Sequence, residues 1–132
     1  MRRGFWRALL NSKASYTCGS GLEYPVRKFF EIPASGALLS SRYFPGLTAL
    51  GFRDGENWMC AEPGDLPDIT LELLSDDLSR AQAIASRGRE LILEQHSLEA
   101  RAQQFRSMIE LIMQGRFDGS EWNQGRLILH GH

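Results

Sequence analysis

Two glutamates near a predicted helix start are the residues of this sequence best suited to chemistry. Glu23 follows the loop Gly19-Ser20-Gly21, and Glu31 comes later with seven residues between them. Pro25 suits the first turn of a helix, because its missing N–H would have no partner there, so a helix is predicted to begin near Tyr24. Free N–H groups at such a start attract phosphate-like anions, and a carboxylate two turns further along can accept hydrogen bonds from hydroxyl groups.

Each of these residues also has an ordinary structural interpretation. Arg27 and Glu31 stand four apart on the predicted helix, where a surface ion pair would contribute about 0.2–0.5 kcal/mol. A pair of glutamates at this spacing also arises by chance, so the spacing alone is not specific. Phe29, Phe30 and Trp58 are interpreted as core or rim packing residues, and Tyr24 is the aromatic residue placed for ligand contact.

Strand-like and helix-like segments alternate along the chain. Apolar patterns and turn residues predict strands at residues 14–18, 37–41 and 57–61. Helices are predicted at 4–12, from Tyr24 to Gly36, at 66–74, from a cap at 75–77 to Ile92, and from a cap at Ser97 to Ile112. This alternation favours an α/β fold, a partial Rossmann-like three-layer domain with a small, mainly parallel sheet and C-terminal helices. Residues 116–132 are predicted to form a loose tail.

The composition is typical of a globular protein and argues against two classes of partner. Hydrophobic residues make up 42% of the chain and charged residues 23%, which predicts one packed domain. A formal net charge of -1 provides no general attraction for nucleic acid. No apolar stretch approaches the about 20 residues of a membrane span, and the run after the basic start is too short for a signal peptide. A cytoplasmic location without a membrane span is therefore predicted.

Cysteine and histidine spacing predicts no metal site and no cofactor. Cys18 and Cys60 are far apart and match no ligand spacing, so they are interpreted as buried or free thiols. His96 is interpreted as a solvated residue at a helix C-terminus, where a positive charge is mildly favoured.

The segment around Glu31 resembles a known signature. Residues 29–36, Phe-Phe-Glu-Ile-Pro-Ala-Ser-Gly, are similar to the Phe-Glu-x-x-Ala-x-Gly signature of the group 1 glycosyltransferases, in particular their spore-maturation-protein-like branch. Further segments follow in the family's order at similar spacing: residues 54–57, 63–65, 73–76 and 87–90, and His96-Ser97 with Arg101. The resemblance covers residues 14–113.

The resemblance implies a fold and a role for the chain. Such proteins adopt the GT-B fold, in which two Rossmann-like domains face a cleft and the C-terminal domain holds the nucleotide sugar. Residues 1–115 are similar to that C-terminal domain, shortened at its N-terminal side. The acceptor-binding N-terminal domain would be missing or on a partner chain, so we expect the isolated chain to be inactive. Its uncovered sheet edge, or the first helix with Phe5, Trp6 and Leu9, would then favour self-association.

The resemblance also implies roles for particular residues. Glu31 is similar to the glutamate that binds the nucleotide ribose, and Glu23 to the catalytic one that contacts the donor sugar. The backbone at Val26 and Arg27 would meet the diphosphate, with Arg27 and Lys28 as nearby cations. Two alternatives to a sugar-transferring enzyme remain. The chain could be a non-catalytic α/β module that has a structural role or binds a partner, or it could be a truncated reading frame.

Overall fold

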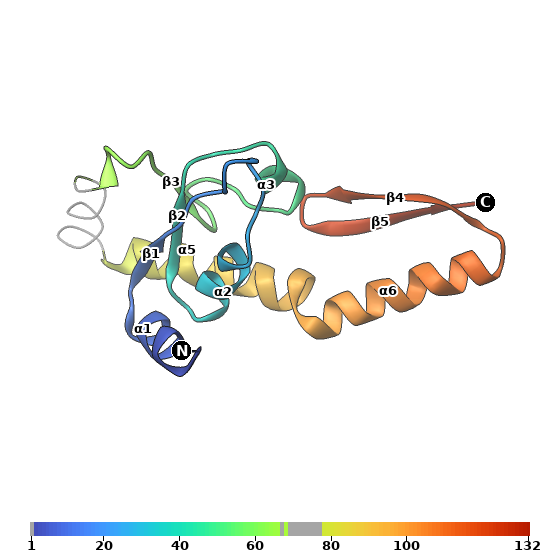
Figure 1. Ribbon diagram of the computed structural model, residues 1–132, viewed down its shortest axis with the longest axis horizontal. Helices are drawn as coiled ribbons and strands as arrows, with labels where there is room; N and C mark the ends of the chain where they lie inside the picture. The colour runs from blue at the N-terminus through green and yellow to red at the C-terminus, as the bar shows by residue number, and fades with distance from the viewer. Residues whose placement is uncertain (1, 67, 69–77) are drawn as a thin grey trace.

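Three short parallel strands form the centre of the computed structural model, which describes residues 2–66, 68 and 78–132. β1 (Ala14–Tyr16) pairs with β2 (Leu38–Ser41), and β2 pairs with β3 (Met59–Cys60), as Figure 1 shows. Parallel neighbours need a crossover connection, and α2 (Lys28–Ala34) lies in the one between β1 and β2. The predicted small parallel sheet is confirmed.

Side chains on the two faces of β2 pack against different helices. Leu39 belongs to the larger core cluster, together with Phe29 of α2. Leu38 packs instead with Ile84 of α5 (Leu78–Leu91). Successive strand residues point to opposite faces of a sheet, so helices cover both faces and the predicted three-layer arrangement is confirmed.

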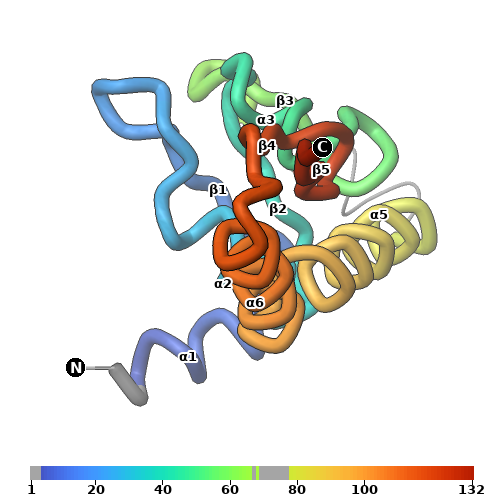
Figure 2. The backbone as a smooth tube through the Cα atoms, turned by 90° about the vertical axis from the view of Figure 1, so that its right-hand side faces the viewer, coloured from blue at the N-terminus to red at the C-terminus, as the bar shows by residue number. Residues whose placement is uncertain are grey.

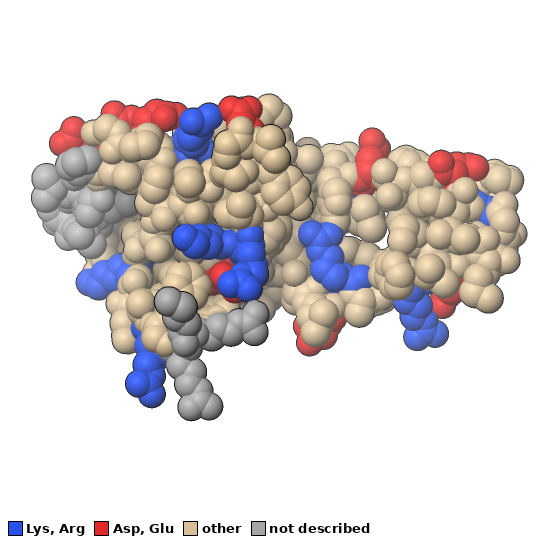
Figure 3. All heavy atoms as spheres, viewed as in Figure 1, with Lys and Arg blue, Asp and Glu red and all other residues tan. Residues whose placement is uncertain are grey.

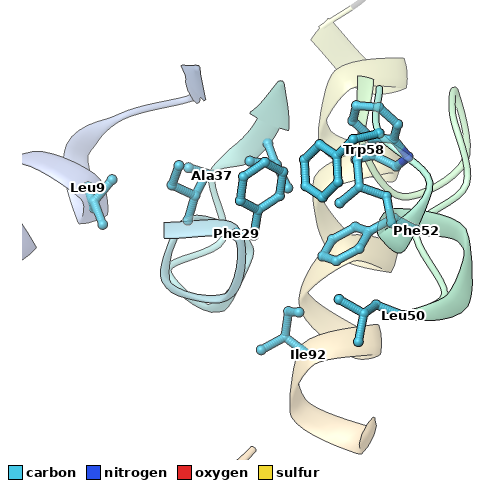
Figure 4. Close-up of a cluster of buried hydrophobic side chains, with 11 residues drawn as sticks. Leu9, Phe29, Ala37, Leu50, Phe52, Trp58 and Ile92 are labelled. Atoms are coloured by element: carbon cyan, nitrogen blue, oxygen red, sulfur yellow. The ribbon is translucent and has the colours of Figure 1, made fainter. Parts of the chain in front are cut away.

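The larger core cluster is built around aromatic rings. Phe29 is fully buried, and its ring lies edge-on to Phe44 and Phe52 with centroids 5.3 and 6.3 Å apart. Trp58 is 1% exposed in the same cluster (Figure 4). Leu9 of α1 (Arg2–Asn11) also packs into it, so α1 is held to the domain by its apolar face. Phe29 and Trp58 are core residues, as predicted.

The segments between the strands differ in part from the prediction. A short helix, α3 (Gly46–Ala49), follows β2 and was not predicted. The predicted helix at 66–74 and the cap at 75–77 lie almost entirely outside the described residues. Cys18 and Cys60 are free thiols. No helix in the described part of the chain is both long enough and apolar enough to cross a bilayer.

A π-helical turn separates the two long helices. α5 runs into η1 (Ile92–His96), and Ser97 then adopts an extended backbone conformation. The Ser97 hydroxyl oxygen accepts a hydrogen bond from the Ala100 N–H at 3.2 Å and caps α6 (Leu98–Met113). The predicted break at His96 and the predicted cap at Ser97 are therefore confirmed.

Apolar residues that recur at three- and four-residue steps along α6 face away from the core. Leu98, Phe105 and Ile112 are 81%, 60% and 48% exposed. The half-buried residues of the helix lie on another face, and a Cβ placed on Gly131 of β5 would lie 3.7 Å from Leu111 Cδ2 on that face. The C-terminal strands cover that other face of α6 and leave these apolar residues exposed.

The segment after Gly115 forms a β-hairpin, so the prediction of a loose tail is wrong. β4 (Phe117–Asn123) pairs with antiparallel β5 (Arg126–Gly131) through a turn in which Gln124 and Gly125 have φ angles of 50° and 87°. A two-residue turn with two positive φ angles suits the twist of a hairpin. The Gly125 N–H donates to the Ala49 carbonyl at 2.9 Å and ties the turn to α3.

α6 and the hairpin lie side by side and project together from the body that holds the sheet (Figures 1 and 2). On the face drawn in Figure 3, acidic and basic side chains are interspersed over the body and the projection. That face therefore shows no extended patch of one charge.

Gly88 of α5 provides a test of this packing. A Cβ there would lie 2.5 Å from the Asn57 carbonyl oxygen, although alanine favours a helix more than glycine does. We expect Gly88→Ala to lower the free energy of unfolding by about 1–3 kcal/mol, measured by urea denaturation. The control is Gly4→Ala in α1, where a Cβ meets nothing within 4 Å and no loss of stability is expected. Equal denaturation midpoints for the two variants would contradict the proposed contact.

Candidate functional site

A hollow of about 380 Å³ lies beside the loop that follows β1. Loop residues Glu23, Tyr24 and Pro25 form one side of it, and α3 with Leu50 contributes a second side. Arg101 of α6 and Trp122 of β4 line it as well. Ligands of open α/β sheets bind beyond the carboxyl ends of the strands, and this loop leaves the carboxyl end of β1.

Glu23 is held in a turn and paired with an arginine. Its backbone φ is 51°, and its N–H donates to the Ser20 carbonyl at 3.3 Å. Arg42 follows β2 directly, and its Nη2 donates to Glu23 Oε1 at 2.9 Å. The pair connects the chain segments that follow two neighbouring parallel strands. Arg42 is not among the predicted site residues, because its contact with Glu23 joins segments that are 19 residues apart in the sequence.

The helix after this loop begins later than predicted. The Tyr24 N–H donates to the Gly19 carbonyl at 2.8 Å, which keeps Tyr24 in the loop, and α2 starts only at Lys28. Val26 packs partly buried against the core. Arg27 takes the N-cap position, without a hydrogen bond from its side chain to the cap. The prediction of a helix start near Tyr24 is therefore wrong.

Glu31 forms the ion pair that the sequence also allowed. Arg27 Nε lies 2.9 Å from Glu31 Oε1, and the two side chains are 68% and 15% exposed. The other carboxylate oxygen, Oε2, is buried and has no hydrogen-bond partner among the described residues. A buried acceptor without a partner costs free energy, about 1–3 kcal/mol in typical cases. This oxygen is the notable polar feature of α2.

The structure brings together two of the six predicted site residues in one hollow. Glu23 and Tyr24 line it, and the Tyr24 side chain is 64% exposed. Val26, Arg27, Lys28 and Glu31 are not part of its lining. Glu31 instead belongs to the adjoining helix, whose Phe30 forms a wall of the hollow.

His96 is buried, so its interpretation as a solvated residue is wrong. Its Nε2 lies 2.8 Å from the Leu50 carbonyl oxygen, and its Nδ1 lies 3.0 Å from Arg101 Nη2. A guanidinium can only donate, so Nδ1 accepts and the ring proton on Nε2 is donated to Leu50. Burial lowers the pKa of His96 and the Arg101 charge lowers it further, while the hydrogen bond to Leu50 opposes the shift. A neutral imidazole results.

Trp122 of the hairpin completes this cluster. The guanidinium carbon of Arg101 lies 4.0 Å from the centroid of the Trp122 ring, a cation–π contact. The His96 ring contacts both Trp122 and Phe30, with centroid distances of 5.4 Å to each. Trp122 is not among the predicted site residues, because residues 116–132 were predicted to form a loose tail. Arg101 is one of the residues on which the resemblance to the group 1 glycosyltransferases was based.

Residues 5–107 match the family described as glycosyl transferase-like. The chain belongs to this family. The match covers the loop with Glu23 and the helix with Glu31, and it ends within α6 beyond Arg101. The hairpin of this glycosyl transferase-like domain, with Trp122, lies outside the match. Neither the curated proteins nor the solved structures contained a match to the chain.

The buried His96 predicts how stability depends on pH. Its folded pKa lies below the ordinary value of about 6.5, so the unfolded chain takes up a proton first as the pH falls. The stabilisation should be complete above about pH 7 and should decline as the pH falls through about 6.5 and below. Urea denaturation between about pH 5 and 8 measures this decline.

Two variants isolate the contribution of His96. His96→Gln keeps a side-chain donor for Leu50 but does not titrate, so its free energy of unfolding should vary less over this range. His130→Gln removes an exposed histidine of β5 and should behave like the wild type. An identical pH dependence for His96→Gln and the wild type would show that His96 does not govern the decline.

Proposed function

We propose that this glycosyl transferase-like domain binds a nucleoside diphosphate sugar and provides the donor-binding part of a glycosyltransferase. The observation that carries the proposal is Glu31, a carboxylate with a buried, unpartnered oxygen on the helix that follows β1. The family match over residues 5–107 supports it. Residues 1–115 would form the donor domain, of the group 1, spore-maturation-protein-like type with the GT-B fold. The acceptor and any base would come from another domain or chain.

Glu31 would bind the ribose of the nucleotide. Ribose hydroxyls donate hydrogen bonds, and the Oε2 atom of Glu31 lacks a donor. Arg27 pairs with the other oxygen; its side chain is 68% exposed and that of Glu31 is 15% exposed, and a pair four residues apart on a helix contributes about 0.2–0.5 kcal/mol. The Arg27 side chain can therefore move aside at small cost when a ribose approaches.

Glu23 would lie beside the donor sugar. It shares the hollow with Tyr24, and Arg42 fixes the direction of its carboxylate. In the transfer, the bond between the sugar and the diphosphate breaks and the diphosphate leaves with the electron pair. An acceptor hydroxyl oxygen bonds to the sugar carbon, and the hydroxyl proton passes to a base of the other domain or chain. A carboxylate near that carbon stabilises the positive charge that develops on the sugar.

The other predicted contacts concern the diphosphate. The amides of Arg27 and Lys28 precede the first hydrogen bonds of α2, in which Phe29 donates to the Val26 carbonyl at 2.9 Å. In the proposal the backbone near Val26 and Arg27 meets the diphosphate, with Lys28 as a further cation. The helix has only 7 residues, so its dipole adds little and another cation would be needed.

A second candidate function is a non-catalytic α/β module that binds a protein partner. The observation that favours it is that both glutamates are already paired, Glu23 with Arg42 and Glu31 with Arg27. In a module of this kind both ion pairs would only stabilise the surface and would bind no ligand. Nucleotide binding separates the two candidates.

Glu31→Ala tests the proposal directly. Loss of a charge-assisted hydrogen bond costs about 1.5–3 kcal/mol, so affinity for uridine or guanosine diphosphate should fall roughly tenfold or more. Calorimetric titration measures both proteins. The control is Glu110→Ala, which breaks another pair of an arginine and a glutamate four residues apart, with Arg106 on α6. Equal affinities for wild type and Glu31→Ala would show that Glu31 serves only in its ion pair with Arg27.

Glu23→Gln tests the division of labour between the glutamates. We expect it to weaken binding of a nucleotide sugar while leaving the matching nucleoside diphosphate almost unaffected, because Glu23 would face the sugar. Glu56→Gln is the control, since Glu56 pairs with Arg53 and does not line the hollow. An equal loss for both ligands would remove the separate role of Glu23.

A further inference from the structure

Arg101 brings a positive charge into the hollow that no described carboxylate balances. The hollow is lined by two charged residues, Glu23 and Arg101, and Glu23 is already paired with Arg42. Arg101 forms no ion pair within the described ranges, and its closest polar partner is the neutral His96. The hollow therefore has an excess of positive charge.

The guanidinium of Arg101 is held in place from two sides. Nη2 lies 3.0 Å from His96 Nδ1, and the Trp122 ring lies 4.0 Å from the guanidinium carbon. Burial lowers the pKa of Arg101, but a guanidinium keeps its charge at neutral pH. The result is a preorganised and partly desolvated cation. Cations of this kind bind anions more strongly than a mobile, fully solvated side chain does.

We propose that Arg101 binds the phosphate groups of the donor in this hollow, with Trp122 as the residue that positions it. The proposal rests on the proposed function and names the additional cation that the diphosphate would need besides Lys28. A guanidinium carries five N–H donors in a planar fork that fits phosphate oxygens, and His96 engages one nitrogen. The remaining donors suffice for a phosphate. The sugar would then share the hollow with Glu23 and Tyr24.

The hairpin becomes part of the binding site under this proposal. Trp122 belongs to β4, and the turn of the hairpin is tied to α3 by the hydrogen bond from Gly125 to Ala49. α3 forms another wall of the same hollow through Ala49 and its neighbour Leu50. Trp122 lies beyond the family match, yet its ring contacts Arg101, which lies inside the match.

Calorimetric titration with inorganic pyrophosphate and with uridine diphosphate tests the proposal on the full chain. We expect Arg101→Gln to weaken pyrophosphate binding roughly tenfold or more, because a charge-assisted contact is lost. Arg106→Gln is the matched control, an exposed arginine on the same helix that does not line the hollow, and it should change affinity less than about twofold. Thermal unfolding of each variant shows whether it is folded.

Trp122 is tested by a pair of substitutions. Trp122→Leu removes the aromatic platform and should weaken pyrophosphate binding several-fold, whereas Trp122→Phe keeps an aromatic face and should restore most of the affinity. If Trp122 has a purely structural role, the pyrophosphate affinity of both variants should follow their loss of stability alone. If Trp122→Leu is folded and binds like the wild type, the positioning role is wrong.

The outcomes separate this inference from the proposed function. If uridine diphosphate binds and folded Arg101→Gln binds it equally well, the inference is wrong while the proposed function stands. If pyrophosphate binds through Arg101 and uridine diphosphate binds no more tightly, the inference stands and the nucleotide role of the domain is wrong. Wild type that binds neither ligand overturns the inference.

If Arg101→Gln does not fold, a measurement on the wild type tests the inference instead. Pyrophosphate should then shift the NMR signal of the Arg101 Nε–H group and leave that of Arg106 unchanged. An unchanged Arg101 signal at saturating pyrophosphate would overturn the inference.

Discussion

Burial of β2 on both faces is the constraint on which the rest of the structure depends. The strand is short, yet all of its residues are buried, with Leu39 facing α2 and Leu38 facing α5. A parallel strand needs cover on both faces, so the two helices must lie on opposite sides of it. Close approach of α5 to Asn57 requires Gly88, where a side chain has no room. The segments that follow β1 and β2 then meet at one edge, where Glu23 contacts Arg42.

A chain of side-chain contacts connects this body to the projection formed by α6 and the hairpin. It runs from the Leu50 carbonyl through His96 to Arg101 and on to Trp122. Every member is at least half buried, so the hydrogen bonds are shielded from water and disruption of one leaves a polar group without a partner. The same contacts determine the neutral tautomer of His96 and the position of the Arg101 cation. Structural stability and the electrostatics of the hollow therefore depend on one cluster.

The two glutamates of the candidate site are paired in a way that is compatible with exchange for a ligand. Both arginine partners are substantially exposed, and exposed ion pairs contribute little to stability. The carboxylates themselves differ, since Glu31 is mostly buried while Glu23 is not. A buried carboxylate with an unsatisfied oxygen gains more from a ligand hydroxyl than an exposed one does. Under the proposed function, this difference would give Glu31 the larger role in affinity and leave Glu23 to face the sugar.

The sequence by itself determined the three parallel strands, the helices α1, α2, α5 and α6, the cap at Ser97 and the glycosyl transferase-like family, but not α3 or the hairpin. These features are local, because strand and helix periods and a side-chain cap depend on residues within a few positions of one another. Only the tertiary structure decided that Tyr24 stays in a loop, that His96 is buried and that Trp122 reaches the hollow. His96 and Trp122 depend on partners far away in the sequence, such as Leu50 for His96, and the hydrogen bond of Tyr24 depends on a loop closure that propensity does not encode. The sequence alone indicated Glu23 and Tyr24, which line the hollow, and the local pair of Arg27 with Glu31. Arg42, Arg101 and Trp122 are brought to their places by the packing of separate segments, which local patterns do not encode.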